Sequence, residues 1–147
     1  ADLVISIPRL KTHHWAGVTL SLKNLFGIVP GARYGWPKNI LHINGISPSI
    51  IGLYRLVPEV ISVVDGIVGM EGDGPLFGTL VEHGLLAVGR DSLAVDVTCA
   101  QLMGFQLEEI EHLALGAWAG VGQAANIKTV GVSVDRLMKK YQRPPGW

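Results

Sequence analysis

The residues best suited to chemistry gather in one short, cation-rich segment, residues 9–23. Its cations and imidazoles are Arg9, Lys11, His13, His14 and Lys23. Three permanent cations can bind a phosphate, a carboxylate or an anionic cofactor, and a helix beginning near Thr19 would add N–H groups at its positive end. Because an imidazole titrates near neutral pH, His13 or His14 could instead transfer protons. The alternative is that Arg9 and Lys11 are solvated loop charges and that one histidine packs in the core.

A second candidate is the segment DGIVGMEGDGPLFG, residues 65–78, where acids stand among glycines. Glycines let the backbone approach a ligand closely, and carboxylates bind Mg²⁺ or Ca²⁺ or act as general acids and bases. We expect Asp65 to contact a cofactor and Glu71 and Asp73 to offer metal ligands, on a loop that faces the cationic segment. The spacing is not that of an EF-hand, and the alternative is a surface loop with solvated acids.

Asp96 is the third candidate, because the segment around it, residues 89–104, is apolar on almost every side. Such a segment predicts a buried helix, and a buried carboxylate needs a partner or stays protonated. Its candidate partners are Arg90, Arg9, Lys23 and backbone N–H groups. Asp96 is either part of a fixed core ion pair or a group that orients a cofactor-binding lysine or histidine of the first segment.

These residues must be positioned by an alternation of strand-like and helix-like segments. The expected strands are residues 2–7, 59–65, 85–88 and 127–132. The expected helices begin near 19 or 21, 47, 91, 107 and 133 and end near 25, 57, 104, 118 and 141. The segments 9–17, 31–38 and 66–78 are expected to be loops. The alternation predicts an α/β fold with a mixed, mostly parallel sheet and flanking helices. In such sheets ligands gather beyond the carboxyl ends of the strands, where the first two candidate segments lie.

Length and composition limit the number of domains and the amount of charged surface. The 147 residues suit one α/β domain, residues 1–147. Only 16% of the residues are charged, against roughly a quarter in a typical domain. We therefore expect a fragment of a larger domain, with a face that the missing part of its own chain or a homo-oligomer partner covers.

Charge and cysteine content exclude several classes of function. Twelve basic and twelve acidic residues cancel, which argues against a nucleic acid partner. No apolar run reaches the roughly 18 residues of a membrane span. The single Cys99 excludes an iron–sulfur cluster held by this chain alone. We expect a cytoplasmic location and a small anionic ligand as partner.

Four blocks of the sequence resemble the domain-of-unknown-function family 362. They are, in order, ADLVISIPRLKTH, TLSLKNLFGIVP, VVDGIVGMEGDGP, and GRDSLAVD followed by LMG. The resemblance covers nearly the whole chain and implies the later part of that domain. Members of the family often carry ferredoxin-like iron–sulfur segments elsewhere. This implies one alternative function, a non-catalytic binding or scaffold domain of an iron–sulfur redox protein.

A more distant resemblance concerns the nickel-pincer lactate racemases. His13, Ala16, Gly17 and Lys23 keep the spacing of a block in that family. The resemblance implies an acid/base role for His13, attachment of the pincer cofactor to Lys23, and nickel ligation by His42. The glycines that precede the lysine in that family are absent, because Leu-Ser-Leu stands in their place. The alternatives are therefore an enzyme domain that binds an anionic ligand or cofactor, a scaffold domain, and a racemase-like acid/base enzyme, with a divalent metal as a candidate cofactor.

Overall fold

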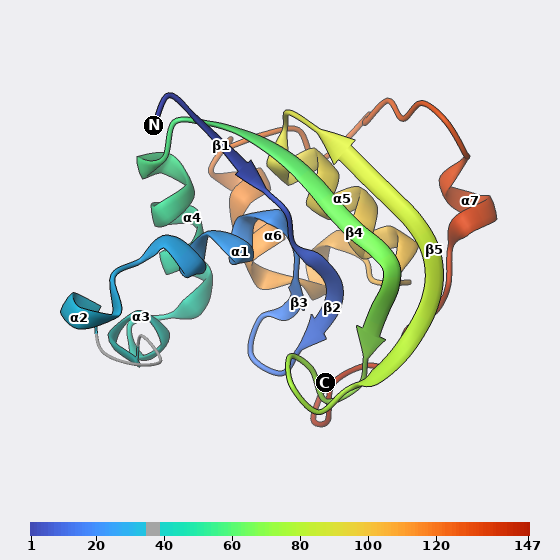
Figure 1. The fold of residues 1–147 in the computed structure, drawn as a ribbon, viewed down its shortest axis with the longest axis horizontal. Helices are drawn as coiled ribbons and strands as arrows, with labels where there is room; N and C mark the ends of the chain where they lie inside the picture. The colour runs from blue at the N-terminus through green and yellow to red at the C-terminus, as the bar shows by residue number, and fades with distance from the viewer. Residues whose placement is uncertain (35–38) are drawn as a thin grey trace.

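One long strand, β4 (Glu59–Glu71), forms the centre of the fold. Along one edge it pairs first with β1 (Leu3–Ser6) and then with β2 (Arg9–His13), both parallel to it. Along the other edge it pairs with the antiparallel β5 (Thr79–Gly89), and β3 (Gly17–Thr19) adds antiparallel to β2. This sheet is shown in Figure 1. The structure, a computed structural model, describes residues 1–34 and 39–147.

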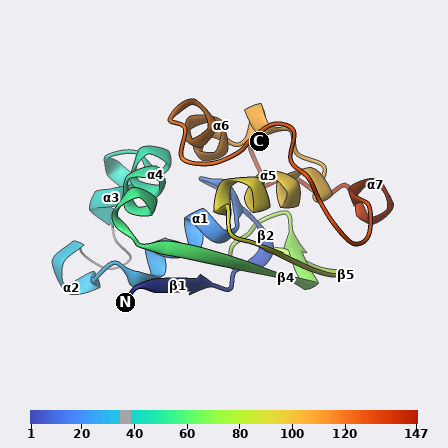
Figure 2. The ribbon, with the colours of Figure 1, turned by 90° about the horizontal axis from the view of Figure 1, so that it is seen from above.

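The main helices lie on one side of the sheet (Figure 2). Helices α1 (Ser21–Asn24) and α5 (Ser92–Leu102) contact the strands, and α4 (Ile46–Leu56) and α6 (Glu111–Trp118) pack on them. The shorter elements are α2 (Gly31–Tyr34), α3 (Asn39–Ile43), α7 (Val134–Leu137) and 3₁₀ turns at Leu25–Ile28 and Leu107–Glu109. None of the described helices is long and apolar enough to cross a bilayer.

The other face of the sheet is apolar and open. Side chains alternate along a strand, so Leu85 faces the helices and is 6% exposed, whereas its neighbour Leu86 is 62% exposed. Ile5 and Val88 also face outward and are more than half exposed. Within the described part of the chain nothing covers this face, and its cover by a further segment or a second copy stays a prediction.

The mixed α/β fold is confirmed, with one strand prediction wrong. The segments 2–7, 59–65 and 85–88 fall in β1, β4 and β5 of the same sheet. Residues 127–132 form no strand; with β5 and α5 they line a groove of about 560 Å³. The positive φ angles of Asn126 (55°) and Gly131 (103°) turn the backbone out of the extended conformation at both ends of this segment.

Two expected loops contain strand instead. The glycine-rich loop shrinks to residues 72–78, because β4 continues through Gly66 and Gly69. A side chain at Gly66 would collide with Leu85, and one at Gly69 would collide with the Tyr141 hydroxyl. These glycines therefore serve close packing within a strand. The expected polar loop 9–17 contains β2, which pairs on both of its edges in spite of its polar side chains.

Among the predicted helices, α5 agrees best with the structure. The Asp91 side chain accepts a hydrogen bond from Ala94 N (3.0 Å) and is the expected N-cap. Helix α4 begins one residue before its expected cap, Ser47, whose hydroxyl donates to Glu111 instead (2.6 Å). The expected last helix, residues 133–141, is reduced to α7. Beyond α7 the chain is irregular: Tyr141 N donates to Met103 O (2.9 Å), and Trp147 N closes a final turn on Pro144 O (3.2 Å). The expected irregular segment 31–38 holds α2, and residues 35–38 lie outside the described residues.

The register of β5 can be tested with a pair of neighbouring substitutions. Leu85→Ala should lower the free energy of unfolding by about 2–5 kcal/mol, because it empties a buried apolar position next to Leu10. Leu86→Ala should change it by less than about 0.5 kcal/mol, because Leu86 lies on the open face. Urea denaturation of the 147-residue chain measures both. Equal losses for the two variants would contradict the assigned register, because a one-residue slip exchanges the two faces.

Candidate functional site

The turn after β2 fixes the ring of His13. Its Nδ1 accepts hydrogen bonds from Trp15 N (3.1 Å) and Ala16 N (3.3 Å). Because Nδ1 is an acceptor, the proton of the neutral ring lies on Nε2. His13 thus closes the turn with one nitrogen and keeps an N–H on the other.

Further rings extend from His13 in a chain of contacts. The ring of His14 stacks on His13 with centroids 4.9 Å apart, and Trp15 packs edge-on against both His14 (5.1 Å) and His42 (5.0 Å). On the other side of His42 lies Phe26 (5.6 Å), and Lys23 Nζ is 4.6 Å from the centroid of Phe26. We call His13, His14, His42 and Lys23 the histidine cluster. It includes His13, Lys23 and His42, the three residues to which the racemase resemblance gives chemical roles.

The charged groups around His13 all disfavour its protonated form. Burial first, and then charge repulsion from Lys23, His14, His42 and Lys11, together lower its pKa to about 3. The expectation that His13 titrates near neutral pH is therefore wrong, because a partly buried imidazole beside cations resists protonation. At neutral pH His13 is a neutral hydrogen-bond donor through Nε2.

The loop of residues 72–78 faces this cluster through its carbonyl oxygens. His14 donates from both its backbone N and its Nδ1 to Gly74 O, each at 3.0 Å. Thr12 Oγ1 donates to Gly72 O (2.9 Å), and Lys11 Nζ donates to Pro75 O (3.5 Å). Burial and the nearby Arg9 lower the pKa of Lys11. The loop and the cationic segment are therefore neighbours, with backbone carbonyls in the place where carboxylates were expected.

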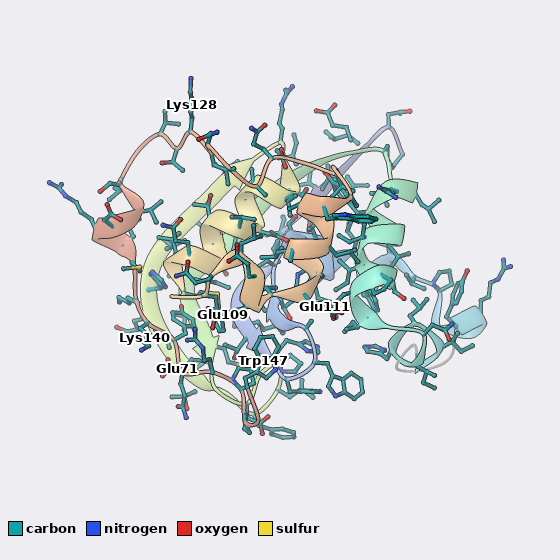
Figure 3. The ribbon with its side chains drawn as sticks, turned by 180° about the vertical axis from the view of Figure 1, so that it is seen from behind. Glu71, Glu109, Glu111, Lys128, Lys140 and Trp147 are labelled. Carbon is teal, nitrogen blue, oxygen red and sulfur yellow. The ribbon has the colours of Figure 1, made fainter. Side chains whose placement is uncertain are left out.

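The predicted carboxylates lie apart from one another. Asp65 pairs in register with the exposed Arg9 on β2, and its carboxylate accepts a hydrogen bond from Ile67 N (3.0 Å). Glu71 accepts from Gln142 N in the C-terminal tail (2.8 Å), as its position beside that tail in Figure 3 shows. Asp73 is exposed in the loop. In residues 1–34 and 39–147 no group of three or more His, Cys, Asp or Glu side chains is arranged to hold a metal ion.

Asp96 is fully buried and holds the start of α1. Its two carboxylate oxygens accept hydrogen bonds from Ser21 N and Leu22 N, both at 2.8 Å. The residue at the N-cap of α1 is Leu20, which has no side-chain acceptor, so Asp96 supplies the cap from another helix. The prediction of a buried carboxylate with backbone N–H partners is confirmed. The alternative of a core ion pair is wrong for the described residues, where Arg90 lies 3.7 Å from Glu59 and no salt bridge reaches Asp96. Burial raises the pKa of Asp96 to about 7, and the two N–H groups oppose this rise.

A chain of buried hydroxyls fixes the same helix to the sheet. Ser21 Oγ lies 2.6 Å from Ser62 Oγ on β4, and Ser62 Oγ donates to Ser92 Oγ at the start of α5 (2.9 Å). All three serines are almost completely buried. Since Lys23 follows two residues after Ser21, this network and Asp96 together set the position from which Lys23 reaches the histidine cluster.

His112 is not among the site residues that the sequence predicts. It is completely buried on α6, and the charge of Lys23 acts on it. The carbonyl of Ala16 lies near the ring, but neither ring nitrogen makes a hydrogen bond of good geometry to any described residue. Burial, followed by Lys23, lowers its pKa to about 3. No local signal marks this residue, because its neighbours in sequence are those of an ordinary buried helix.

Asp96→Ala should lower the free energy of unfolding by about 3 kcal/mol, because it leaves two buried N–H groups without an acceptor. Asp96→Asn keeps one acceptor oxygen and should lose less. Urea denaturation at pH 7 gives both values. A midpoint for Asp96→Ala equal to that of the wild type would show that α1 does not depend on this cap.

His112 should make the protein sensitive to acid. The unfolded chain protonates this residue below pH 6.5, but the folded chain does not until about pH 3, so stability falls as the pH drops from 6.5 towards 3. His112→Leu removes this effect. Relative to the wild type, the variant should gain about 2 kcal/mol more at pH 5 than at pH 8. Urea midpoints at the two pH values provide the measurement, and a difference that does not depend on pH would refute the lowered pKa.

Comparisons with known proteins agree with the resemblance to a family of unknown function. Residues 1–101 match the family described as "Domain of unknown function (DUF362)". Over 138 residues the chain is 31% identical to a protein of Synechocystis sp. named "Thylakoid-associated protein sll1697". The matched region is 92% of this chain and 43% of that relative, so the chain spans less than half of the relative's length. No solved structure matches the chain.

These comparisons do not show the likeness to the nickel-pincer racemases, which stays a prediction. The family match, in contrast, takes in more than two thirds of the 147 residues, along the strands and helices that build the histidine cluster. The chain therefore belongs to the family DUF362, a domain of unknown function.

Proposed function

We propose that this domain binds a small anionic ligand at the histidine cluster. One observation carries the proposal. The neighbouring groups whose charges act on His13 are Lys23, His14, His42 and Lys11, and all of them lower its pKa. A partly buried position with a positive potential of this kind favours a bound negative charge.

The ligand would be held by electrostatic attraction and by hydrogen bonding, each from a different residue. Lys23 supplies a permanent cation from the start of α1, and His13 donates from Nε2 without itself becoming charged. Trp15, which is more than half exposed, offers a flat apolar surface beside the imidazoles. A ligand with a phosphate or carboxylate group next to a planar or apolar part would use all three features.

Binding would also change the proton affinity of His13. A bound anion offsets the repulsion from Lys23 and His14, and therefore raises the pKa of His13 from its low value. Ligand binding would then be accompanied by the uptake of a proton by His13 as the pH falls. The same response would allow His13 to act as an acid or base only when the ligand is present.

The nearness of Lys23 and His42 to His13, whose pKa both of them lower, favours a second candidate, the racemase-like enzyme. In that family the lysine holds the pincer cofactor and a single further histidine ligates nickel, which fits a cluster without a three-residue metal site in the described residues. Such a cofactor would supply a redox-active or hydride-accepting centre when bound. The residues of this chain would hold it through Lys23 and His42 and position a proton at His13. The intact mass of the protein purified from its own organism separates the two candidates, because only this one adds a covalent group to Lys23.

The binding proposal is tested with inorganic phosphate and acetate as probes. Titration of the wild type, followed by NMR of the imidazole signals, should shift the signals of His13 and raise its pKa. His13→Asn keeps an acceptor for the turn but loses the Nε2 donor, and Lys23→Gln loses the cation. Each should weaken binding at least about tenfold, which is about 1.4 kcal/mol.

Lys128→Gln is the matched control. Lys128 is an exposed lysine, and Figure 3 shows it at the opposite end of the molecule from Trp147, whose indole N–H donates to His14 O. Its loss should leave binding unchanged. If neither probe binds the wild type, or if all three variants bind alike, the site does not bind anions and the scaffold interpretation takes its place.

A further inference from the structure

The loop between β4 and β5 carries two apolar side chains into solvent. Leu76 is 75% exposed and Phe77 is 83% exposed. The tip of the loop, residues 74–78, is Gly-Pro-Leu-Phe-Gly and contains no charged residue. The ligand site proposed above makes no use of these two side chains.

The loop that carries them is held in place from two directions. Within the loop, Phe77 N donates to Asp73 O (3.0 Å), and Gly72 N donates to Gln142 O of the C-terminal tail (2.9 Å). From β2, Thr12 and His14 donate to the carbonyls of Gly72 and Gly74. The two apolar side chains are therefore presented by an ordered loop rather than left outside by a loose one. Exposed apolar groups held in this way mark contact surfaces.

Two tryptophans lie at the same end of the molecule. Trp147 Nε1 donates to His14 O (3.0 Å), and Trp15 packs against the His14 ring. Trp15 is 59% exposed and Trp147 is 44% exposed. Figure 1 shows the C-terminus, the turn between β2 and β3 and the loop between β4 and β5 together at this end. We call Trp15, Leu76, Phe77 and Trp147 the apolar tip.

We propose that the apolar tip docks on the surface of a lipid bilayer, with Leu76 and Phe77 entering the boundary of the acyl chains. Trp15 and Trp147 would lie at the level of the headgroups, where an indole keeps its ring in apolar surroundings and its N–H near polar groups. Two apolar side chains at the end of one loop, with tryptophans beside them, are typical of shallow insertion into a bilayer, whereas a stable protein interface needs a broader apolar surface. The net charge of zero indicates an association that does not depend on anionic lipids.

Vesicle flotation of the 147-residue chain tests this proposal. The chain should float with vesicles of phosphatidylcholine and to a similar extent with vesicles that also contain phosphatidylglycerol. The double variant Leu76→Ser/Phe77→Ser should reduce the bound fraction at least about tenfold. Because both residues are exposed, its urea midpoint should equal that of the wild type, which shows that it is folded.

The matched control is Leu86→Ser/Val88→Ser, which removes two apolar side chains of similar exposure from the open face of the sheet. It should float like the wild type. The proposal is overturned if the wild type binds neither kind of vesicle, if it binds only the anionic vesicles, or if the control variant loses binding as much as the tip variant. The last outcome would assign bilayer contact to the open sheet face.

Discussion

The cap that Asp96 places on α1 is the interaction on which the histidine cluster depends. Helix α1 has only four residues and no capping side chain of its own, and a helix of that length has little stability in isolation. Two hydrogen bonds from its first N–H groups to a buried carboxylate hold its N-terminal end at a fixed position in the core. Lys23 directly follows Leu22 in this helix, so the position of this cation is decided by a residue more than seventy positions further along the chain.

The hydroxyl chain from Ser21 through Ser62 to Ser92 strengthens the same junction. It connects α1, the central strand and the start of α5 within one buried layer. Buried polar groups are costly unless each finds a partner, and here the carboxylate, the backbone N–H groups and the hydroxyls satisfy one another. A polar centre of this kind fixes geometry more narrowly than apolar packing does, which suits a helix that must present a single lysine.

The loop of residues 72–78 belongs to both proposals in different ways. Its carbonyl oxygens accept hydrogen bonds from Lys11, Thr12 and His14 on the side of the histidine cluster. Its Leu76 and Phe77 side chains lie on the outer side of the same loop. A ligand that moved the His14 ring would act directly on the loop, because that ring is bonded to Gly74. This loop thus contacts the proposed ligand site and also carries two residues of the apolar tip, and Trp15 belongs to both.

The sequence by itself determined the α/β class, three of the four expected strands and the cap of α5 at Asp91. These features depend on periodicity and local capping, which a few consecutive residues carry. It also singled out Asp96 as a buried acid in need of partners, because an apolar surrounding is visible in the sequence alone. The loop prediction for Gly66 and Gly69 was wrong. These glycines leave room for Leu85 and Tyr141, which come from distant parts of the chain and so are not visible in the local sequence.

Only the tertiary structure decided which of the candidate residues meet. It separated Arg9 and Asp65 from the histidines, because the two residues pair at the start of β2, about 13 Å of extended strand before His13. It joined His42 and the unexpected His112 to the neighbourhood of Lys23, through contacts between helices that no local pattern encodes. It also set the pKa of His13 far below its ordinary value, because burial and the charges around a side chain are properties of the folded chain and not of its sequence neighbours.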